Sequence, residues 1–425
     1  MLFLMPLNAG AVPSFARQTG TQCVTCHTVF PELTPFGRWF KLRGYTLSSG
    51  AKSSGLAALP LSGTVLVSNT STQNTTGADP ENFPRDDQTI LQVAGVYYAG
   101  RISEKSGAFV QYSYDGIERN WGVEMADIRY ADSTTVNSAE LVYGVTLNNT
   151  PTVQDAWNSI PVWGFPHVAD AGLMPAASTL LDMTLASQVG GFGLYGLWDN
   201  LLYGELTFYR SADRGGLRPL STGVAVENVL SDYAPYWRLA LQSDRGAHSM
   251  QVGIYGMVAE IYPDADDPSG STNRFRDIGV DTQYQYLGGD HSFSAQATWI
   301  RERQKWNASF AQGATANSSD DLTTIKANAH YAYQHRYGGG LGYFSTFGDT
   351  DVLKYMIDPV MGSANGSPNT RGWMLELDYL PWDWTKFAVR YTDYEKFNGA
   401  ATDYDGFGRN AADNNTLYLM GWFLF

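Results

Sequence analysis

The chain of 425 residues carries 28 Lys and Arg against 42 Asp and Glu, which gives a formal net charge of −14. This acidic balance disfavours a nucleic acid partner, because the phosphates of nucleic acids attract Lys and Arg. Charged residues are only 16% of the chain, whereas soluble globular proteins average roughly 25%.

Aromatic residues make up 14% of the sequence, yet no apolar run reaches the roughly 18 residues that indicate a transmembrane helix. Low charge, many aromatic side chains and short apolar segments together favour an all-β fold, a transmembrane antiparallel β-barrel. A large secreted β-sandwich or β-helix is the alternative. The strand lengths and the last strand, described below, argue against it.

Residues 1–11 resemble the end of a secretory signal peptide. Leu2–Met5 is a short apolar stretch, and Ala9–Ala11 matches the small-x-small pattern of a cleavage site. No Lys or Arg precedes Arg17, so the usual basic start of such a peptide is missing. We expect cleavage after Ala11 and an exported mature chain that begins at Val12.

The only two cysteines lie in one short motif, Cys23-Val24-Thr25-Cys26-His27. C-x-x-C-H is the attachment signal of a c-type haem. The two thiols form thioethers with the haem vinyl groups, and the adjacent imidazole becomes the proximal axial ligand of the iron. Two intervening residues make one tight turn that directs both sulfurs at neighbouring ring edges and places His27 under the iron.

Other interpretations of this motif are weaker. A redox-active C-x-x-C pair needs a βαβ context, which the surrounding residues do not provide. A zinc site normally takes four ligands, and only three candidates are local. An ordinary disulfide would leave the histidine after Cys26 unexplained. We therefore expect one covalently attached haem c.

Residues 12–60 form the predicted haem-binding segment. Thr34 is placed to N-cap a short helix that has Pro35 at its first position and Gly44 at its C-terminal end. The aromatic residues of this helix are candidates for packing against the haem: Phe36, Trp39 and Phe40. Its cations are candidates for neutralising the haem propionates, with a solvated helix face as the equal alternative: Arg38, Lys41 and Arg43.

This segment is too short to enclose a haem alone, because chains below roughly 40 to 60 residues rarely build their own core. We expect its haem-bearing face to pack against another part of the molecule. The interior wall of the barrel is the obvious candidate. The haem segment is therefore predicted to act as a plug, not as a free cytochrome on a tether.

Residues 61–425 form the predicted barrel. They divide into about sixteen alternating segments whose lengths match the roughly 9–11 residues of a membrane strand. The predicted strands are Leu61–Thr70, Ile90–Ile102, Ala108–Gly116, Val123–Tyr130, Ala139–Asn148, Ser187–Trp198, Leu201–Arg210, Tyr233–Gln242, Ser249–Ile261, Phe275–Leu287, Ser292–Arg303, Leu322–His335, Gly340–Thr350, Arg371–Leu380, Thr385–Tyr394 and Thr416–Phe425.

The connections between these segments alternate between long and short, as in bacterial outer-membrane barrels. The long ones are 71–89, 149–186, 211–232, 262–274, 304–321, 351–370 and 395–415, and the connection 117–122 is a short exception. Tight turns such as Asp199-Asn200 join the other strand pairs. This alternation predicts that both chain ends, and the haem segment, lie on the periplasmic side.

The last predicted strand ends in Trp422-Phe423-Leu424-Phe425. A terminal aromatic residue on an alternating strand resembles the sorting signal of bacterial outer-membrane barrels. Phe425, Phe423, Leu419 and Leu417 share one face, which is predicted to meet lipid.

The connection 149–186 is the longest and is rich in Pro and aromatic residues, so we expect a packed loop that folds into the lumen. Its His167 and Met174 are the first candidates for the distal ligand of the haem iron, although each is more often an ordinary loop residue. His, Met or no side chain remain open as that ligand.

The N-terminal residues resemble those of the fused monohaem cytochrome–porins. The best-described members of that family are outer-membrane iron oxidases of Fe(II)-oxidising bacteria. The close match covers about residues 12–46, and the barrel matches only in architecture. The residues that carry the resemblance are Pro13–Gly20, Cys23–His27, Pro31–Arg38, Phe40–Leu42 and Gly44-Tyr45.

The resemblance implies an oxidoreductase that takes one electron from an extracellular donor, Fe(II) first, and passes it through the haem to a periplasmic c-type cytochrome. The family also contains members whose donor is not established, so a conduit for another donor stays open. A second hypothesis is a solute porin whose haem segment serves as a plug or sensor. No catalytic residue beyond the haem ligands is predicted.

Overall fold

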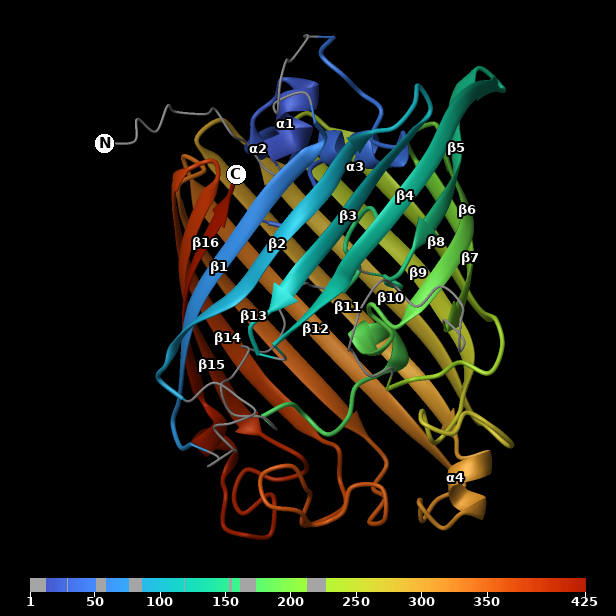
Figure 1. Ribbon diagram of the computed structural model, residues 1–425, viewed down its shortest axis with the longest axis vertical. Coiled ribbons are helices and arrows are strands. Elements are labelled where there is room, and N and C mark those ends of the chain that lie inside the picture. Colours follow the sequence, from blue (N-terminus) through green and yellow to red (C-terminus); the bar gives the residue numbers. More distant parts are fainter. Residues whose placement is uncertain are drawn as a thin grey trace.

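The computed structural model describes residues 13–28, 30–50, 59–75, 86–117, 119–152, 155–160, 173–211 and 227–425. Within these residues, sixteen antiparallel strands form a closed barrel (Figure 1). Each strand pairs with its neighbours in chain order, and β1 closes the barrel against β16. The predicted fold class, a barrel of about sixteen strands, is confirmed.

Sixteen strands and a few short helices make up the regular structure of the described residues. The helices are α1 (Pro13–Thr19), α2 (Cys23–Cys26), α3 (Pro35–Leu42) and α4 (Asn307–Ala311), with short turns η2 (Leu180–Thr184) and η3 (Ala411–Asn414). The strands are β1 (Leu61–Thr72), β2 (Thr89–Arg101), β3 (Ser106–Asp115), β4 (Asn120–Val136), β5 (Ala139–Asn148), β6 (Val189–Trp198), β7 (Leu202–Ser211), β8 (Ala234–Arg245), β9 (His248–Ile261), β10 (Asn273–Leu287), β11 (His291–Lys305), β12 (Ser319–Tyr333), β13 (Tyr337–Gly348), β14 (Thr370–Trp382), β15 (Thr385–Lys396) and β16 (Thr416–Leu424).

The strands alternate in a sense opposite to that of a soluble barrel. On β10 the inward side chains Asp281 and Gln283 are buried, whereas the outward Ile278 and Val280 are exposed. The last strand follows the same rule, with Leu417, Leu419 and Phe425 exposed on its outer face. Polar residues inside and apolar residues outside are the pattern of a barrel surrounded by hydrocarbon.

Each of the sixteen predicted segments overlaps one strand. The largest error lies at β4, which continues to Val136 because its polar end pairs with β5 as far as Ala139. This hairpin carries Ser, Thr and Asp and extends at the end of the barrel that also holds α1, α2 and α3 (Figure 1). Because the prediction relied on alternating apolar residues, it missed the polar end of β4.

The first described helix, α1, and the end of β16 lie at the same end of the barrel, where α2 and α3 also lie (Figure 1). The described part of the N-terminal segment contacts inward-facing wall residues. Arg38 on α3 donates to the side chains of Gln285 and Ser249, and the Tyr45 hydroxyl donates to Asp127 at 2.6 Å. Among the described residues, no helix combines the length and the apolar character needed to cross a membrane.

The long connection between β5 and β6 enters the lumen, as predicted, at least over its described residues. Trp157 in this loop is fully buried, and its carbonyl oxygen accepts hydrogen bonds from the side-chain amides of Gln283 and Gln296 on the wall. Trp157 also packs with Leu42 at the end of α3. The N-terminal segment and the inward loop therefore meet inside the barrel.

Candidate haem-attachment site

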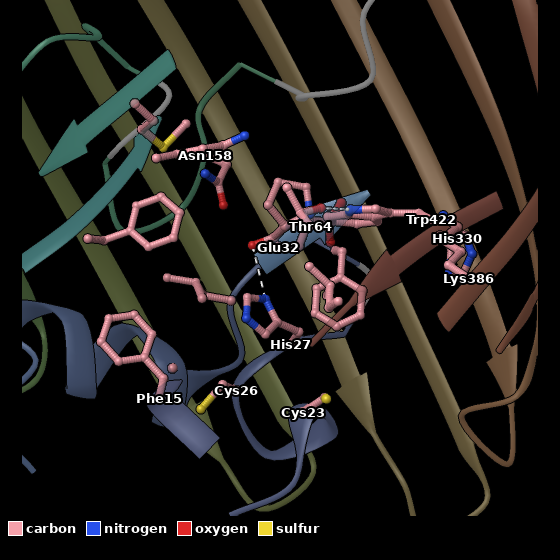
Figure 2. A pocket seen from close by; sticks show the side chains of 18 of the residues that line it. Phe15, Cys23, Cys26, His27, Glu32, Thr64, Asn158, His330, Lys386 and Trp422 are labelled. Atoms are coloured by element: carbon pink, nitrogen blue, oxygen red, sulfur yellow. Dashed lines mark hydrogen bonds between the residues drawn. The ribbon is translucent and has the colours of Figure 1, made fainter. Parts of the chain in front are cut away.

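The C-x-x-C-H motif lies where the N-terminal segment meets the barrel wall. Cys23 and Cys26 are the ends of the single helical turn α2 and are not joined by a disulfide bond. Cys23, Cys26 and His27 all line one cavity inside the barrel mouth (Figure 2). The turn thus presents two thiols and one imidazole to the same space.

The imidazole of His27 has the environment of a metal ligand. Its Nδ1 lies 3.2 Å from the backbone carbonyl oxygen of Pro31, which fixes the proton on Nδ1 and leaves Nε2 as the acceptor. Burial lowers the pKa of His27 to about 4, so the ring is neutral at pH 7. A neutral imidazole with a lone pair on Nε2 is the form that binds iron.

The sequence around the motif explains why α2 and α3 pack so closely. Thr34 caps α3 by accepting a hydrogen bond from the Gly37 N–H at 3.1 Å, and its hydroxyl donates to the Thr25 carbonyl at 2.6 Å. A side chain at Gly37 would overlap the carbonyl oxygen of Cys26. Threonine and glycine at these positions therefore hold the motif in place.

The cavity has a volume of about 450 Å³, within the roughly 300–1,000 Å³ of small-molecule and cofactor sites. Its aromatic lining comes from both the N-terminal segment and the barrel: Phe15, Phe30, Phe40, Tyr97, Phe109 and Trp422. Phe30 packs against His27 with ring centroids 4.8 Å apart and against Trp422 at 5.7 Å. The space beside the imidazole is therefore mainly apolar.

Of the three aromatic residues predicted to pack on the haem, the structure brings one to the cavity. Phe40 is buried, lines the cavity and meets Phe15 edge to face at 5.0 Å. Phe36 and Trp39 pack on each other instead and are not among the lining residues. An i to i+4 spacing identifies one helix face, and Phe36 lies one turn too early on α3 to reach the cavity.

Of the three cations predicted to neutralise the propionates, one lines the cavity and two do not. Lys41 lines the cavity, where burial lowers its pKa to about 8, and its Nζ lies 3.6 Å from Asp127. Arg38 is 2% exposed and is held by wall residues that include Asp244 at 3.3 Å. Arg43 pairs with Glu140 at 2.5 Å. Arg38 and Arg43 therefore anchor α3 to the wall and lie outside the cavity.

The structure does not place either loop candidate for the distal ligand, His167 or Met174, beside the motif. His167 lies outside the described residues, and Met174 is 68% exposed and does not line the cavity. The wall supplies other donors that sequence reasoning missed: Met125, His330, Met374 and Met420. His330 is itself bound through Nε2 to Asp378 at 2.7 Å.

The residues present fit a c-type haem. Two reduced thiols, a neutral imidazole oriented through Nδ1 and an adjoining apolar cavity provide the attachment points, the iron ligand and the surroundings that such a group needs. In the described part of the chain, no three His, Cys, Asp or Glu side chains gather as a site for a bare metal ion.

Comparison with solved structures gives the fold. The outer-membrane channel DcaP of Acinetobacter baumannii matches with a TM-score of 0.50 and 13% identity, over 86% of this chain and 96% of its own. An anion-selective porin of Comamonas acidovorans (TM-score 0.44, 12% identity) and OmpF of Salmonella typhi (0.46, 11%) each cover the same 86% of this chain, with 98% and 97% of their own.

No protein-family model matches the sequence, and the search of curated proteins gives no significant match. The likeness to DcaP therefore concerns architecture alone. The chain has the fold of the outer-membrane porins.

Proposed function

We propose that this protein is a bacterial outer-membrane cytochrome–porin that carries one covalent haem c and transfers electrons one at a time across the outer membrane. The donor is extracellular, Fe(II) in the first instance, and the acceptor is a periplasmic c-type cytochrome. The observation that carries the proposal is the meeting of both thiols and the neutral His27 imidazole in one cavity enclosed by the barrel.

Each residue of the motif has a defined task. Cys23 and Cys26 would form the two thioethers, and His27 would supply a nitrogen ligand to the iron while its Nδ1–H donates to the Pro31 carbonyl. A haem held there supplies one-electron redox chemistry. The aromatic rings of Phe30 and Trp422 would place apolar surface beside the haem, and the polarity around a haem tunes its potential.

The proposed reaction transfers one electron and consumes neither oxygen nor protons. One Fe(II) ion is oxidised to Fe(III) on the outer side, and one oxidised cytochrome is reduced on the periplasmic side. Because the insoluble ferric product forms outside the cell, the electron crosses the envelope and the metal does not. The N-terminal segment and the inward loop suit this task, since together they occupy the lumen where Leu42 meets Trp157.

The experiment that tests the proposal begins with the intact protein matured in a host that attaches c-type haem. Its mass should exceed that of the polypeptide by one haem, and Cys23→Ser with Cys26→Ser should remove this addition. Stopped-flow mixing with Fe(II) should then reduce the holoprotein in a single exponential phase. A polypeptide of unmodified mass would overturn the proposal.

The competing function is a solute porin whose haem segment is a plug or sensor. The fold shared with DcaP is the observation that favours it. Liposome flux measured on the same preparation separates the two functions. Rapid flux of small solutes together with a haem that neither Fe(II) nor another reductant of similar potential reduces would favour the porin.

A further inference from the structure

We infer that Lys386 and Arg390 on β15, held in place by Glu376 on β14, form the binding site for the haem propionates. This inference rests on the proposed attachment of haem at Cys23 and Cys26. It assigns the carboxylate end of the cofactor to the barrel wall and not to the cations of α3, two of which lie outside the cavity.

The three side chains form one compact group on the cavity wall. Lys386 Nζ donates to Oε1 of Glu376 at 2.7 Å, and Arg390 donates through Nε and Nη2 to Oε2 at 2.8 and 2.6 Å. All three line the cavity. The Lys386 and Glu376 side chains are 7% and 13% exposed, so this pair is held largely away from water.

The ammonium group of Lys386 can donate more hydrogen bonds than it makes with the described residues. An ammonium carries three N–H donors, and among the described residues the Nζ of Lys386 has one hydrogen-bond acceptor, Glu376. A buried cation is stabilised only when its donors are satisfied. A carboxylate entering the cavity would supply the missing acceptors at a position where Arg390 also reaches.

The position agrees with the chemistry of the cofactor. In a c-type haem the propionates leave the porphyrin on the edge opposite the two thioethers. Figure 2 shows Cys23 and Cys26 below His27, and Lys386 on the side of the cavity away from Phe15. A haem attached at Cys23 and Cys26 would therefore have room to direct its carboxylates toward Glu376, Lys386 and Arg390.

The other charged side chains of the lining have partners of their own. Lys41 is directed to Asp127, and Glu32 is held by Ser294 and Asn328 on the far strands β11 and β12. Glu124 accepts from the side chain of Gln111. In the described part of the lining, Lys386 and Arg390 are the two cations that share a single carboxylate.

The test uses the holoprotein and its Lys386→Gln and Arg390→Gln variants. Infrared difference spectra between oxidised and reduced forms, recorded with haem labelled at the propionate carbons, should show a shifted carboxylate band in both variants. Loss of the positive charge should also lower the equilibrium constant for reduction about tenfold, which is about 59 mV for one electron.

Arg301→Gln is the matched control, because Arg301 forms an exposed ion pair with Asp321 and does not line the cavity. It should leave both the band and the potential unchanged. Glu376→Gln keeps both cations and should move the carboxylate band in the opposite direction. This variant therefore tests the propionate site even if either cation variant loses its haem.

A carboxylate band that stays in place in Lys386→Gln, Arg390→Gln and Glu376→Gln would overturn the inference, even if the potential moves. This failure is distinct from failure of the proposed function. In the first case the haem is attached and bound elsewhere by its propionates, and in the second the parent protein carries no haem.

Discussion

The sulfur of Cys23 lies 2.9 Å from the backbone carbonyl oxygen of Asp383, a residue 360 positions away in the sequence. Asp383 is in the turn between β14 and β15, flanked by two tryptophans whose rings stack at 5.0 Å. Trp384 packs inward near Trp422, whereas Trp382 is 55% exposed. The first cysteine of the motif thus contacts the barrel rim beside an exposed aromatic surface.

This contact predicts that the tryptophan pair serves the exit of electrons. Replacing Trp382 and Trp384 together with Ala should slow the reduction of a soluble c-type cytochrome several-fold, because the pair flanks the Asp383 carbonyl that Cys23 contacts. The measurement is stopped-flow mixing of the reduced holoprotein with increasing cytochrome concentrations. Haem content should not change, since neither tryptophan belongs to the motif.

Trp373→Ala is the control, because Trp373 is another exposed tryptophan on β14 but lies toward the opposite end of the strand. It should reduce the cytochrome at the parent rate. Equal rates in the double variant and in the control would assign Trp382 to the lipid interface, where barrel tryptophans commonly lie.

A second prediction concerns the packing of α2 on α3. Gly37→Ala should lower the amount of haem attached per polypeptide, because the added methyl group overlaps the Cys26 carbonyl and meets Leu33 at 3.1 Å. Overpacking of this kind costs about 1–3 kcal/mol. Pyridine haemochrome absorbance combined with intact mass measures the haem per chain.

Gly289→Ala in the turn after β10 is the comparison, since an added Cβ has no heavy atom within 4 Å there. It should attach haem normally. Full attachment in Gly37→Ala would show that the motif does not depend on its close contact with α3.

Much of the fold was predictable because its signals are local. Alternation with a period of two and the lengths of the turns identified every strand of the barrel, and Thr34 and Pro35 identified the start of α3. The last strand also contained a clue that went unused. If Phe423 and Phe425 face lipid, then Trp422 must face the lumen, which is where it lies.

The composition of the site was not predictable, because it depends on the closure of the barrel. Lys386 lines the cavity because closure of the barrel brings β15 beside the N-terminal segment. Helix periodicity placed Arg38 on a polar face but did not tell whether that face meets the haem or the wall. The partners that decide this, Asp244 and Ser249, are more than two hundred residues away.

A third prediction tests the anchor of the N-terminal segment. Asp127 is buried on β4 and accepts hydrogen bonds from Tyr45 at 2.6 Å and Arg129 at 2.9 Å, with Lys41 at 3.6 Å. Asp127→Ala should leave two buried cations without this carboxylate, which costs about 3–5 kcal/mol. We expect faster amide hydrogen exchange across residues 35–45.

Asp132→Ala on the same strand is the matched control. Asp132 pairs with Lys105 at 2.5 Å on the surface, where such a pair contributes only about 0–1 kcal/mol. Exchange across residues 35–45 should stay at the parent rate in this variant. Protection that persists in Asp127→Ala would mean that the contacts of Arg38 and Arg43 suffice to hold α3 against the wall.

The last prediction concerns the inward loop. Arg238 on β8 is fully buried, donates to Asp281 at 2.9 Å and lies 3.9 Å from Asp155 in the loop. Its guanidinium also lies over the ring of Trp157, 5.1 Å from the centroid. Arg238 therefore holds the described residues Asp155 and Trp157 of the loop by both charge and ring contact.

Arg238→Met should release this loop, because it leaves Asp281 and Asp155 buried without their cation, at a cost of about 3–5 kcal/mol. We expect a higher single-channel conductance in planar bilayers and faster hydrogen exchange over residues 155–160. Arg301→Met removes an exposed arginine from the neighbouring part of the barrel and should change neither quantity. If conductance rises while Fe(II) still reduces the haem at the parent rate, the loop closes the lumen to solutes without taking part in electron entry. A parent-like conductance with unchanged exchange would show that the hydrogen bonds from Gln283 and Gln296 suffice to hold Trp157 in the lumen.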